Sequence, residues 1–196
     1  MGLVAFVLVA LAYDHEPLAS VDAEVSDWVA ASLPGWVEAV ARPFSWLGGW
    51  IGITALTVVA VVLLARERNW LDVGFVLAAV VGSQIAVALL KAWIDRARPA
   101  VGSAVPLPES AAFPSGHATS GIAALGAFTI LAAERMPSRR ARVWLWVCAV
   151  IVGLGVGLSR IALNVHFVTD VLAGWCFGLA WLAGCLLVRD RLRASG

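Results

Sequence analysis

The sequence predicts an all-α integral membrane protein: a bundle of six transmembrane helices, with short interfacial helices in the first outer loop. Of its 196 residues, 61% are apolar and 14% are charged, whereas about 25% of residues are charged in an ordinary soluble domain. The charges are also unevenly spread, because five stretches of 17 to 24 residues contain no Asp, Glu, Lys or Arg. A helix of about 20 residues crosses the hydrocarbon core of a bilayer, so each stretch predicts one span.

These uncharged stretches define five of the six spans. The spans are predicted at residues 46–65, 71–93, 116–133, 143–163 and 167–188. The remaining apolar segment, 2–13, fits either a short or truncated first span or a cleaved signal peptide that lacks the usual basic residue. Residues 21–41 carry Pro34 and scattered acids, a pattern typical of one or two short helices at the membrane surface. We expect residues 1–196 to form a single domain.

Arginines indicate the orientation of this bundle. Nine of them fall in alternate connections, at positions 66, 68, 135, 139, 140, 142, 189, 191 and 193. The first long loop is instead rich in acids and has Arg42 as its one basic residue. Because short cytoplasmic loops are enriched in Lys and Arg, we expect the nine arginines and both termini on the cytoplasmic side of the plasma (inner) membrane. The first long loop then lies outside.

The up-and-down path brings four ionisable residues to the outer ends of the helices. These are Lys91, His117, Arg160 and Asp170. Ionisable groups bordering membrane helices are costly, so their convergence at one level predicts a functional site. Nearby bases outnumber acids, which suits an anion, and neither this set nor the three cysteines has metal-site spacing. We therefore expect no metal and no cofactor, and the net charge of +1 gives no reason to expect a nucleic-acid partner.

Lys91 and Arg98 form the first motif of this site. They are seven residues apart, which is two helical turns, so both side chains point from one face if the helix continues past Trp93. Pro99 would then end that helix. The two cations are expected to bind an anion, although lysine and arginine that snorkel to the membrane surface give the same pattern.

The second motif is Pro114-Ser115-Gly116-His117, which precedes a helix of small residues. Proline favours the first helical position, and Ser115 and Gly116 would expose backbone N–H groups at the positive end of the helix. Gly116 also has no side chain to keep a phosphate from the backbone. An ordinary turn before a helix has the same pattern, so this motif alone leaves both interpretations open.

The third motif is Ser159-Arg160, followed by His166 and Asp170. On a helix, His166 and Asp170 are four residues apart and share a face, so the carboxylate accepts from one ring nitrogen and leaves the other with an exposed lone pair. This arrangement orients a base or a nucleophile. A His–Asp pair by itself is more often structural, but a second histidine and several basic residues at the same level favour a catalytic site.

In order and spacing, the three motifs resemble those of the type 2 phosphatidic acid phosphatase family. That family contains lipid phosphatases, lipid phosphotransferases and soluble haloperoxidases, and the predicted spans exclude the last. The resemblance implies that His166 attacks phosphorus to form a phosphohistidine, that Asp170 orients it, and that His117 protonates the leaving oxygen. It also implies five phosphate-binding residues, Lys91, Arg98, Ser115, Gly116 and Arg160, with supporting roles for Ser159 and Pro114.

The expected function is a metal-independent phosphatase in the membrane bilayer that acts on a lipid phosphate at the extracytoplasmic face. Candidate substrates are polyprenyl diphosphate, phosphatidic acid and phosphatidylglycerophosphate, and analogy with the recycling of a cell-envelope carrier favours the first. A phosphotransferase has the same motifs. A non-catalytic transporter or scaffold for anionic lipids remains a third hypothesis, but binding alone gives no reason for an aligned His–Asp pair and a second histidine. The sequence does not indicate an oligomeric state.

Overall fold

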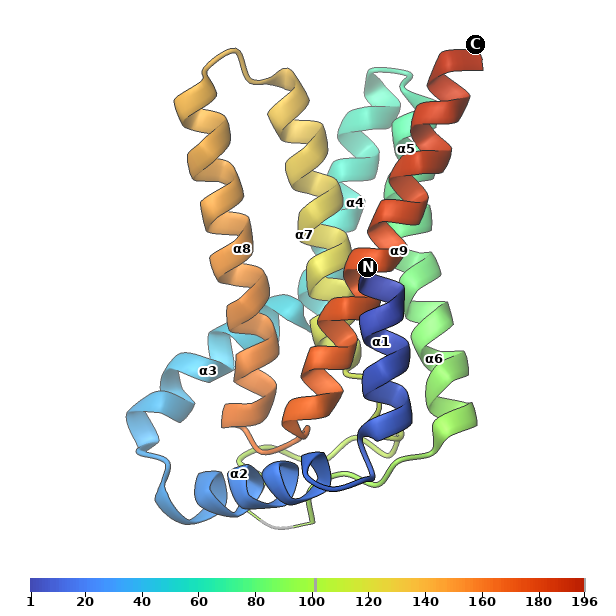
Figure 1. Cartoon of the computed structure of the whole chain (residues 1–196). Coiled ribbons are helices and arrows are strands. Elements are labelled where there is room, and N and C mark those ends of the chain that lie inside the picture. The colour runs from blue at the N-terminus through green and yellow to red at the C-terminus, as the bar shows by residue number, and fades with distance from the viewer. Residues whose placement is uncertain (101, 196) are drawn as a thin grey trace.

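The computed structural model describes residues 1–100 and 102–195, and all regular structure within them is helical (Figure 1). The helices are α1 (Gly2–Ala12), α2 (Leu18–Ser32), α3 (Gly35–Gly48), α4 (Trp50–Arg66), α5 (Trp70–Leu77), the π-helical turn η1 (Ala78–Gly82), α6 (Ser83–Ile94), α7 (Gly116–Arg135), α8 (Arg139–Ala162) and α9 (Val168–Ser195).

Several of these helices are long and apolar enough to cross a membrane. Within the described residues there are four such segments: Trp70–Ile94, which joins α5, η1 and α6, and the helices α7, α8 and α9. The pair α3 and α4 is bent by 45° and adds a fifth if it is counted as one span. The apolar helix α1 has 11 residues, or about 16 Å at 1.5 Å per residue, roughly half the hydrocarbon thickness. The predicted all-helical membrane architecture is confirmed at this level.

The observed helix ends coincide with some of the predicted span boundaries and extend beyond others. The spans predicted at 71–93 and 116–133 end within two residues of the observed helices. The predicted start at Trp46 falls inside α3, which continues to Gly48, and the chain breaks at Gly49 before α4. The break also needs Gly52, where a Cβ atom would lie 2.4 Å from the carbonyl oxygen of Leu47.

Helix α7 forms the centre of the bundle and packs most extensively against α9. The two approach closely because glycines of α9 face α7: a Cβ atom at Gly174 would lie 2.8 Å from the Ser115 carbonyl oxygen, and one at Gly178 would lie 2.8 Å from that of Thr119. On α8, a Cβ atom at Gly153 would lie 3.1 Å from Ile122 of α7. Small residues at these positions allow close helix packing.

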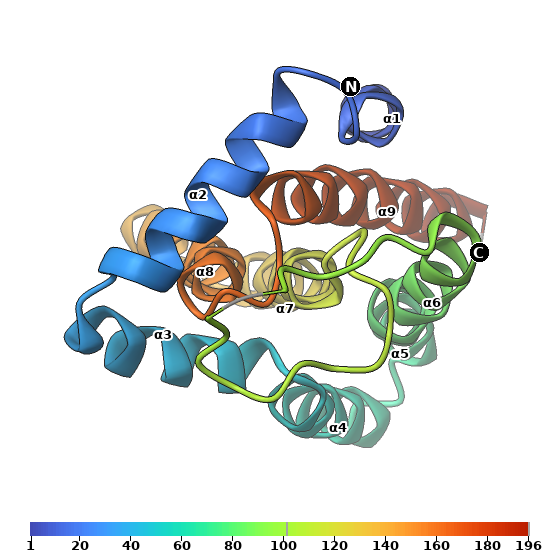
Figure 2. The ribbon, with the colours of Figure 1, turned by 90° about the horizontal axis from the view of Figure 1, so that it is seen from below.

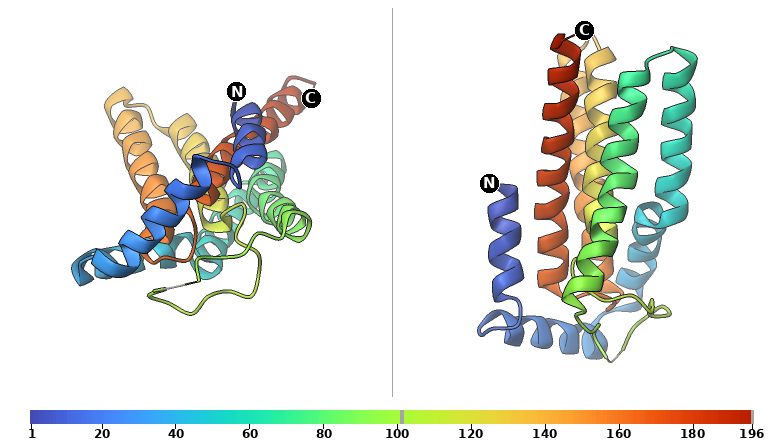
Figure 3. Two further views of the ribbon diagram at one scale, coloured as in Figure 1. Left: turned by 60° about the horizontal axis from the view of Figure 1, so that its bottom comes forward. Right: turned by 90° about the vertical axis from the view of Figure 1, so that its right-hand side faces the viewer.

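One end of the bundle, here called the arginine-rich end, contains the α4–α5 and α7–α8 connections and the C-terminus (Figures 1 and 3). Helix α9 continues past the predicted span end at Val188 to Ser195. Arg189 is buried in this extension, where its Nε donates to Asp72 at 2.7 Å and its terminal nitrogens donate to Glu134 at 2.8 and 2.7 Å. The ion pairs join α5, α7 and α9 and keep the end of α9 in the bundle.

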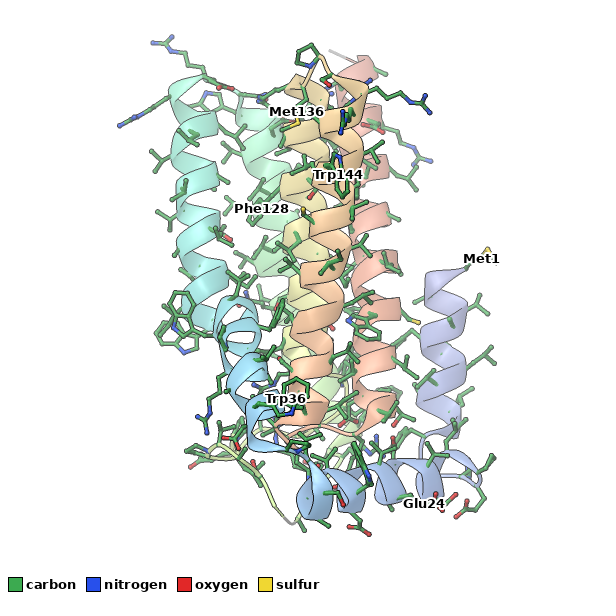
Figure 4. The ribbon with its side chains drawn as sticks, turned by 90° about the vertical axis from the view of Figure 1, so that its left-hand side faces the viewer. Met1, Glu24, Trp36, Phe128, Met136 and Trp144 are labelled. Atoms are coloured by element: carbon green, nitrogen blue, oxygen red, sulfur yellow. The ribbon has the colours of Figure 1, made fainter. Side chains whose placement is uncertain are left out.

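The opposite end is covered by a helix and a long connection. Helix α2 lies across the ends of α8 and α9, and the chain between α6 and α7 passes over the same end (Figure 2). Helix α1 packs against α9, and Met1 lies partway along the bundle, far from the level of Glu24 (Figure 4).

Candidate active site

The residues of the three sequence motifs lie at the end of the bundle opposite the arginine-rich end. They are Lys91 near the end of α6 and Arg98 after it; Pro114, Ser115, Gly116 and His117 at the start of α7; Ser159 and Arg160 near the end of α8; and His166 and Asp170 at the α8–α9 connection and the first turn of α9. Four separate parts of the chain thus meet at one level, as the up-and-down path requires.

His166 and Asp170 form a buried pair. His166 Nδ1 lies 3.2 Å from Asp170 Oδ2, which also accepts the backbone N–H of Phe167 at 2.9 Å. On the other side of the ring, His166 Nε2 lies 3.1 Å from a terminal nitrogen of Arg98. A guanidinium only donates, so Nε2 accepts and the imidazole proton is on Nδ1. Burial lowers the pKa of His166 to about 4, against the opposing effect of Asp170, so the imidazole is neutral at pH 7.

The connection that carries His166 is fixed by Asn164. This residue has a φ of 50°, a left-handed conformation that asparagine tolerates better than most residues. Its side-chain nitrogen donates to the carbonyl oxygen of Ser26 at 3.1 Å, and the Ser26 hydroxyl donates back to Asn164 at 3.0 Å. Helix α2 therefore holds the turn that directs His166 into the site.

Arg98 reaches the site from the connection after α6, and not from a helix. Helix α6 ends at Ile94, and Asp95 follows with a φ of 47°. The helix therefore does not continue to Arg98, and the condition for Lys91 and Arg98 to share one helix face is not met. The Arg98 guanidinium donates to the carbonyl oxygens of Val165 and Ser110, both at 2.8 Å, which ties the α6–α7 connection to the His166 turn. Burial lowers the pKa of Arg98, with Asp170 opposing, but an arginine remains charged at neutral pH.

Lys91 is directed at the same connection from the last turn of α6. Its ammonium group donates to the carbonyl oxygen of Ala111 and, at 3.4 Å, to that of Ala112. Arg98 also donates to the Ala111 carbonyl, at 3.3 Å. The two cations of the first motif are thus brought together by the carbonyl groups of the connection and not by one helix face.

The start of α7 presents donors to the site. Ser115 is the N-cap of α7, and its backbone N–H donates to the Asp170 carbonyl oxygen at 2.9 Å. The first N–H groups of a helix have no partner within the helix, which makes this end suitable for an anion. Within residues 1–100 and 102–195, the side-chain atoms Ser115 Oγ and Arg160 Nε are buried without a hydrogen-bond partner. Buried polar groups normally have a partner, so both atoms are free to bind a ligand.

The break between α3 and α4 contributes two further residues to the site. Arg160 donates a hydrogen bond to the hydroxyl of Ser45 on α3. A Cβ atom at Gly49 would lie 3.5 Å from His117 Nε2, so the backbone at the break faces the second histidine. Neither Ser45 nor Gly49 was predicted, because residues 46–65 were interpreted as one span.

Two motif residues, Ser159 and Pro114, are held by the helix ends that carry them. The Ser159 hydroxyl donates to the carbonyl oxygen of Val156 at 2.7 Å, within α8, and Pro114 is buried before the α7 N-cap. His117, in contrast, lies close enough to interact electrostatically with His166 and with the basic residues of the site, Arg160, Arg98 and Lys91. The roles of these three residues stay predictions.

Arg96 is a residue that the motifs did not identify. It donates to Asp170 at 2.6 Å and to Asp22 of α2 at 2.8 Å. The sequence offered only a weak signal, an additional base near Lys91 and Arg98. Asp22 was interpreted as one of the scattered acids of the first loop, and no local pattern links it to a residue so far along the chain.

A cavity of about 610 Å³ opens beside these residues. Lys91, Gly116 and His117 line it at the α7 end, and its apolar lining includes Val87 and the exposed Trp50. Charged and apolar residues therefore line the same cavity. Over the described part of the chain, no three or more His, Cys, Asp or Glu side chains are grouped so as to hold a metal ion.

Comparisons with known proteins agree with this geometry. Residues 69–194 match the profile of the PAP2 superfamily. The chain is 28% identical to phosphatidylglycerophosphatase B of Bacillus subtilis over 176 residues, which is 89% of this chain and 86% of that protein. It is 36% identical to decaprenylphosphoryl-5-phosphoribose phosphatase of Mycobacterium tuberculosis over 74% of this chain and 76% of that protein.

Further similarities support the same family. An undecaprenyl-diphosphatase of Sulfolobus acidocaldarius is 32% identical over 68% of this chain and 60% of that protein. The fold matches the crystal structure of a transmembrane PAP2-type phosphatidylglycerolphosphate phosphatase from Bacillus subtilis with a TM-score of 0.89, over 97% of this chain and 94% of that chain, at 24% identity. The chain therefore belongs to the PAP2 superfamily of membrane lipid phosphatases.

Proposed function

We propose that this protein hydrolyses a lipid phosphate or diphosphate through a phosphohistidine formed on His166. The observation that carries this proposal is the contact of His166 Nδ1 with Asp170, at 3.2 Å, which leaves Nε2 as the acceptor beside a cationic group. A neutral imidazole oriented by a carboxylate is an activated nucleophile. Its free nitrogen faces the part of the site where positive charge is concentrated and where a phosphoryl group would bind.

The phosphoryl oxygens are bound by groups that the structure brings to this point. Lys91, Arg98 and Arg160 supply positive charge, while the Ser115 hydroxyl and the Gly116 N–H supply hydrogen bonds. We expect a phosphoryl oxygen to replace His166 Nε2 as the acceptor for Arg98. Fixed positive charge stabilises the equatorial oxygens of a transferring phosphoryl group. Ser159 and Pro114 support the site through the ends of α8 and α7.

The reaction has two steps. In the first, His166 Nε2 attacks phosphorus, an N–P bond forms, and the P–O bond to the lipid breaks. His117 donates a proton to the leaving oxygen, which departs on the lipid, and Asp170 stabilises the positive charge that develops on the ring of His166. In the second, water attacks phosphorus, the N–P bond breaks, and His117 accepts a proton from that water. Inorganic phosphate then leaves, and His166 is neutral again.

The cavity beside the site suits a substrate with a long apolar chain. Its end next to the site, here called the charged end, is lined by Lys91, Gly116 and His117, and Asp95 and Glu109 also belong to the lining. Its apolar residues include Val87 and the exposed Trp50. A lipid can place its phosphate at the charged end while its chain remains among the apolar residues. The substrate class is therefore a lipid phosphate or diphosphate, such as a polyprenyl diphosphate, phosphatidic acid or phosphatidylglycerophosphate.

The bundle is proposed to cross the plasma membrane six times as one domain, with α2 and part of α3 at the membrane surface and the site on the extracytoplasmic side. The support is the grouping of connections that carry arginine at the opposite end. Helix α1 is the short member of the set, and it runs from partway along the bundle toward the site end (Figure 3). The C-terminus lies at the arginine-rich end, on the cytoplasmic side, and the same alternation assigns the N-terminal side of α1 to the cytoplasm.

The reaction is proposed to need no divalent metal, because the charge that a metal would supply comes from Lys91, Arg98 and Arg160. If a metal ion activated the water, removal of that ion would abolish turnover. EDTA treatment followed by desalting is expected to leave phosphate release nearly unchanged. Loss of activity that Mg²⁺ or Zn²⁺ restores would contradict this part of the proposal.

The decisive experiment is phosphate release by the purified protein in detergent across the three lipid classes. His166→Ala is the inactive variant, and Arg140→Gln, an exposed substitution at the other end of the bundle, is the matched control. We expect release with wild type and Arg140→Gln and none with His166→Ala. Phosphate transferred to an added lipid alcohol in place of water would identify a phosphotransferase. Lipid binding without turnover would identify a transporter or scaffold.

A further inference from the structure

Arg96 connects the histidine–aspartate pair to helix α2. Its Nη1 donates to Asp170 Oδ1 at 2.6 Å and to the Thr169 hydroxyl at 2.7 Å. Its Nη2 donates to Asp22 Oδ2 at 2.8 Å. One guanidinium therefore joins the acid that contacts His166 to a second acid on another helix.

Asp22 is bound to the start of α9 as well as to Arg96. Its Oδ1 accepts the backbone N–H of Thr169 at 3.0 Å, and its Oδ2 accepts the Thr169 hydroxyl. A carboxylate at the first turn of a helix interacts favourably with the helix dipole. The Asp22 side chain is 2% exposed and that of Asp170 is 0% exposed, and buried charges of this kind need a paired partner.

Two aromatic rings restrict the guanidinium of Arg96. The centroids of Tyr13 and Phe167 each lie 4.5 Å from Arg96 Cζ. Tyr13 follows α1, and Phe167 belongs to the α8–α9 connection. A planar guanidinium stacks well on aromatic faces. Its position is thus fixed by α1, α2 and α9 together, although the residue itself lies in a non-helical segment.

The two oxygens of Asp170 have separate partners. Oδ2 contacts His166 Nδ1 and the Phe167 N–H, while Oδ1 accepts from Arg96. Rotation of the carboxylate would break both sets of contacts. We propose that Arg96 and Asp22 are positioning residues, which hold Asp170 toward His166 and balance each other's charge so that Asp170 keeps its attraction for the imidazole. This inference rests on the proposed phosphatase function.

The charge balance around His166 makes the inference testable. The groups that interact electrostatically with the His166 ring are Asp170 of α9, Arg98 of the α6–α7 connection, Lys91 of α6 and His117 of α7. Arg160 of α8 interacts with His117, and Arg96 and Asp22 lie behind Asp170. Removing the positive charge of Arg96 leaves Asp170 free to attract the His166 proton more strongly. Removing the negative charge of Asp22 leaves Arg96 uncompensated and has the opposite effect.

The first measurement is the titration of His166 by NMR of histidine-labelled protein in detergent. The chain has only three histidines, and His166→Ala identifies the signal. We expect Arg96→Gln to raise the titration midpoint by about one pH unit, the lower end of the effect of a nearby charge. Asp22→Asn is expected to lower it, and the double variant to lie near wild type. Because the measurement needs no substrate, it does not depend on catalysis.

The second measurement is the turnover number for a lipid phosphate. Arg96→Lys keeps the charge, but one ammonium group cannot contact Asp170, Asp22 and Thr169 together. We expect the His166 titration of this variant to stay near wild type while kcat falls by about 10- to 100-fold, by analogy with the loss of a residue that orients a metal-bound histidine. KM should change little, because Arg96 is not among the phosphate-binding residues.

Glu24→Gln is the matched control for Asp22→Asn, because it removes an acid from the same helix at an exposed position (Figure 4). Arg140→Gln is the control for Arg96→Gln. Both should retain wild-type titration and kcat. Equal His166 titrations in Arg96→Gln, Asp22→Asn and wild type, or a wild-type kcat in Arg96→Lys, would overturn the inference. A wild-type protein that releases no phosphate while the titrations shift as expected would contradict the proposed function instead.

Discussion

His166 lies between a carboxylate and a guanidinium, a position that fits the proposed attack of a neutral imidazole on phosphorus. Asp170 is 3.2 Å from one ring nitrogen and Arg98 is 3.1 Å from the other. Burial holds the pKa of His166 near 4, so the nucleophile is present at neutral pH and is lost only as the pH falls through that value. Because the Ser115 hydroxyl and Arg160 Nε have no partner within the described residues, the phosphate is expected to bind beside this ring.

The second histidine leads to a prediction about leaving groups. If His117 is the general acid, its importance should depend on how much the leaving oxygen needs a proton. His117→Ala is expected to slow the chemical step by about 10²- to 10⁴-fold with an alkyl phosphate and much less with p-nitrophenyl phosphate. His166→Ala should abolish turnover of both substrates. Equal impairment of His117→Ala on both substrates, in single-turnover rates, would contradict the assignment.

At the scale of elements, the site depends on how closely α9 approaches the start of α7. The Ser115 N–H donates to the Asp170 carbonyl oxygen at 2.9 Å, and Gly174, one turn further along α9, leaves no room for a side chain against Ser115. Backbone contact between α7 and α9 therefore sets the position of the N–H donors at the start of α7 relative to His166. The break between α3 and α4 adds the Ser45 contact to Arg160 in a similar way.

A methyl group at Gly174 should separate these two helices. Its Cβ atom would lie 2.8 Å from the Ser115 carbonyl oxygen and 2.9 Å from the Ala118 side chain. We expect Gly174→Ala to lower the free energy of unfolding in detergent by about 1–3 kcal/mol, as overpacking does, and to reduce phosphate release. Gly184→Ala, on the same helix with no atom within 4 Å of the new Cβ atom, is the control. Equal stability of the two variants would show that the contact is not critical.

At the scale of the molecule, charge separates the two ends. Part of the positive charge at the arginine-rich end is neutralised by ion pairs within the protein. Arg189 pairs with Asp72 and Glu134, and Arg135 contacts Glu67 at 3.1 Å. Arg139 and Arg140 are exposed, so they contribute to the orientation that the positive-inside rule predicts. The site and the acidic residues of α2 are at the other end.

The orientation can be tested with single cysteines in a variant that lacks the three natural ones. Glu24 is exposed at the site end and Arg140 is exposed at the arginine-rich end. A membrane-impermeant thiol reagent applied to intact cells is expected to label Glu24→Cys. Arg140→Cys should react only after the cells are permeabilised. The reverse pattern would place the site in the cytoplasm and contradict the proposed topology.

The sequence predicted the fold class and the residues that meet at the site, because both depend on local patterns. Uncharged stretches predicted the spans, and their up-and-down path predicted that Lys91, His117, Arg160 and Asp170 lie at one level. It did not predict the break at Gly49, because the apolar pattern continues through it, or the left-handed turn at Asp95, which has no clear signal in the sequence. Nor could it predict the contact of Arg96 with Asp22, which depends on how α2 packs across the bundle.

The central claim is that phosphate is bound covalently to His166 during turnover. The most direct test is to quench the reaction of a ³²P-labelled aryl phosphate in alkaline detergent within the first turnover, because a good leaving group favours accumulation of the intermediate. We expect protein-bound label that is stable to alkali, is lost in mild acid, and maps to the peptide containing His166. The label should be absent from His166→Ala. Phosphate release by wild type without bound label, or label retained by His166→Ala, would contradict a phosphohistidine on His166.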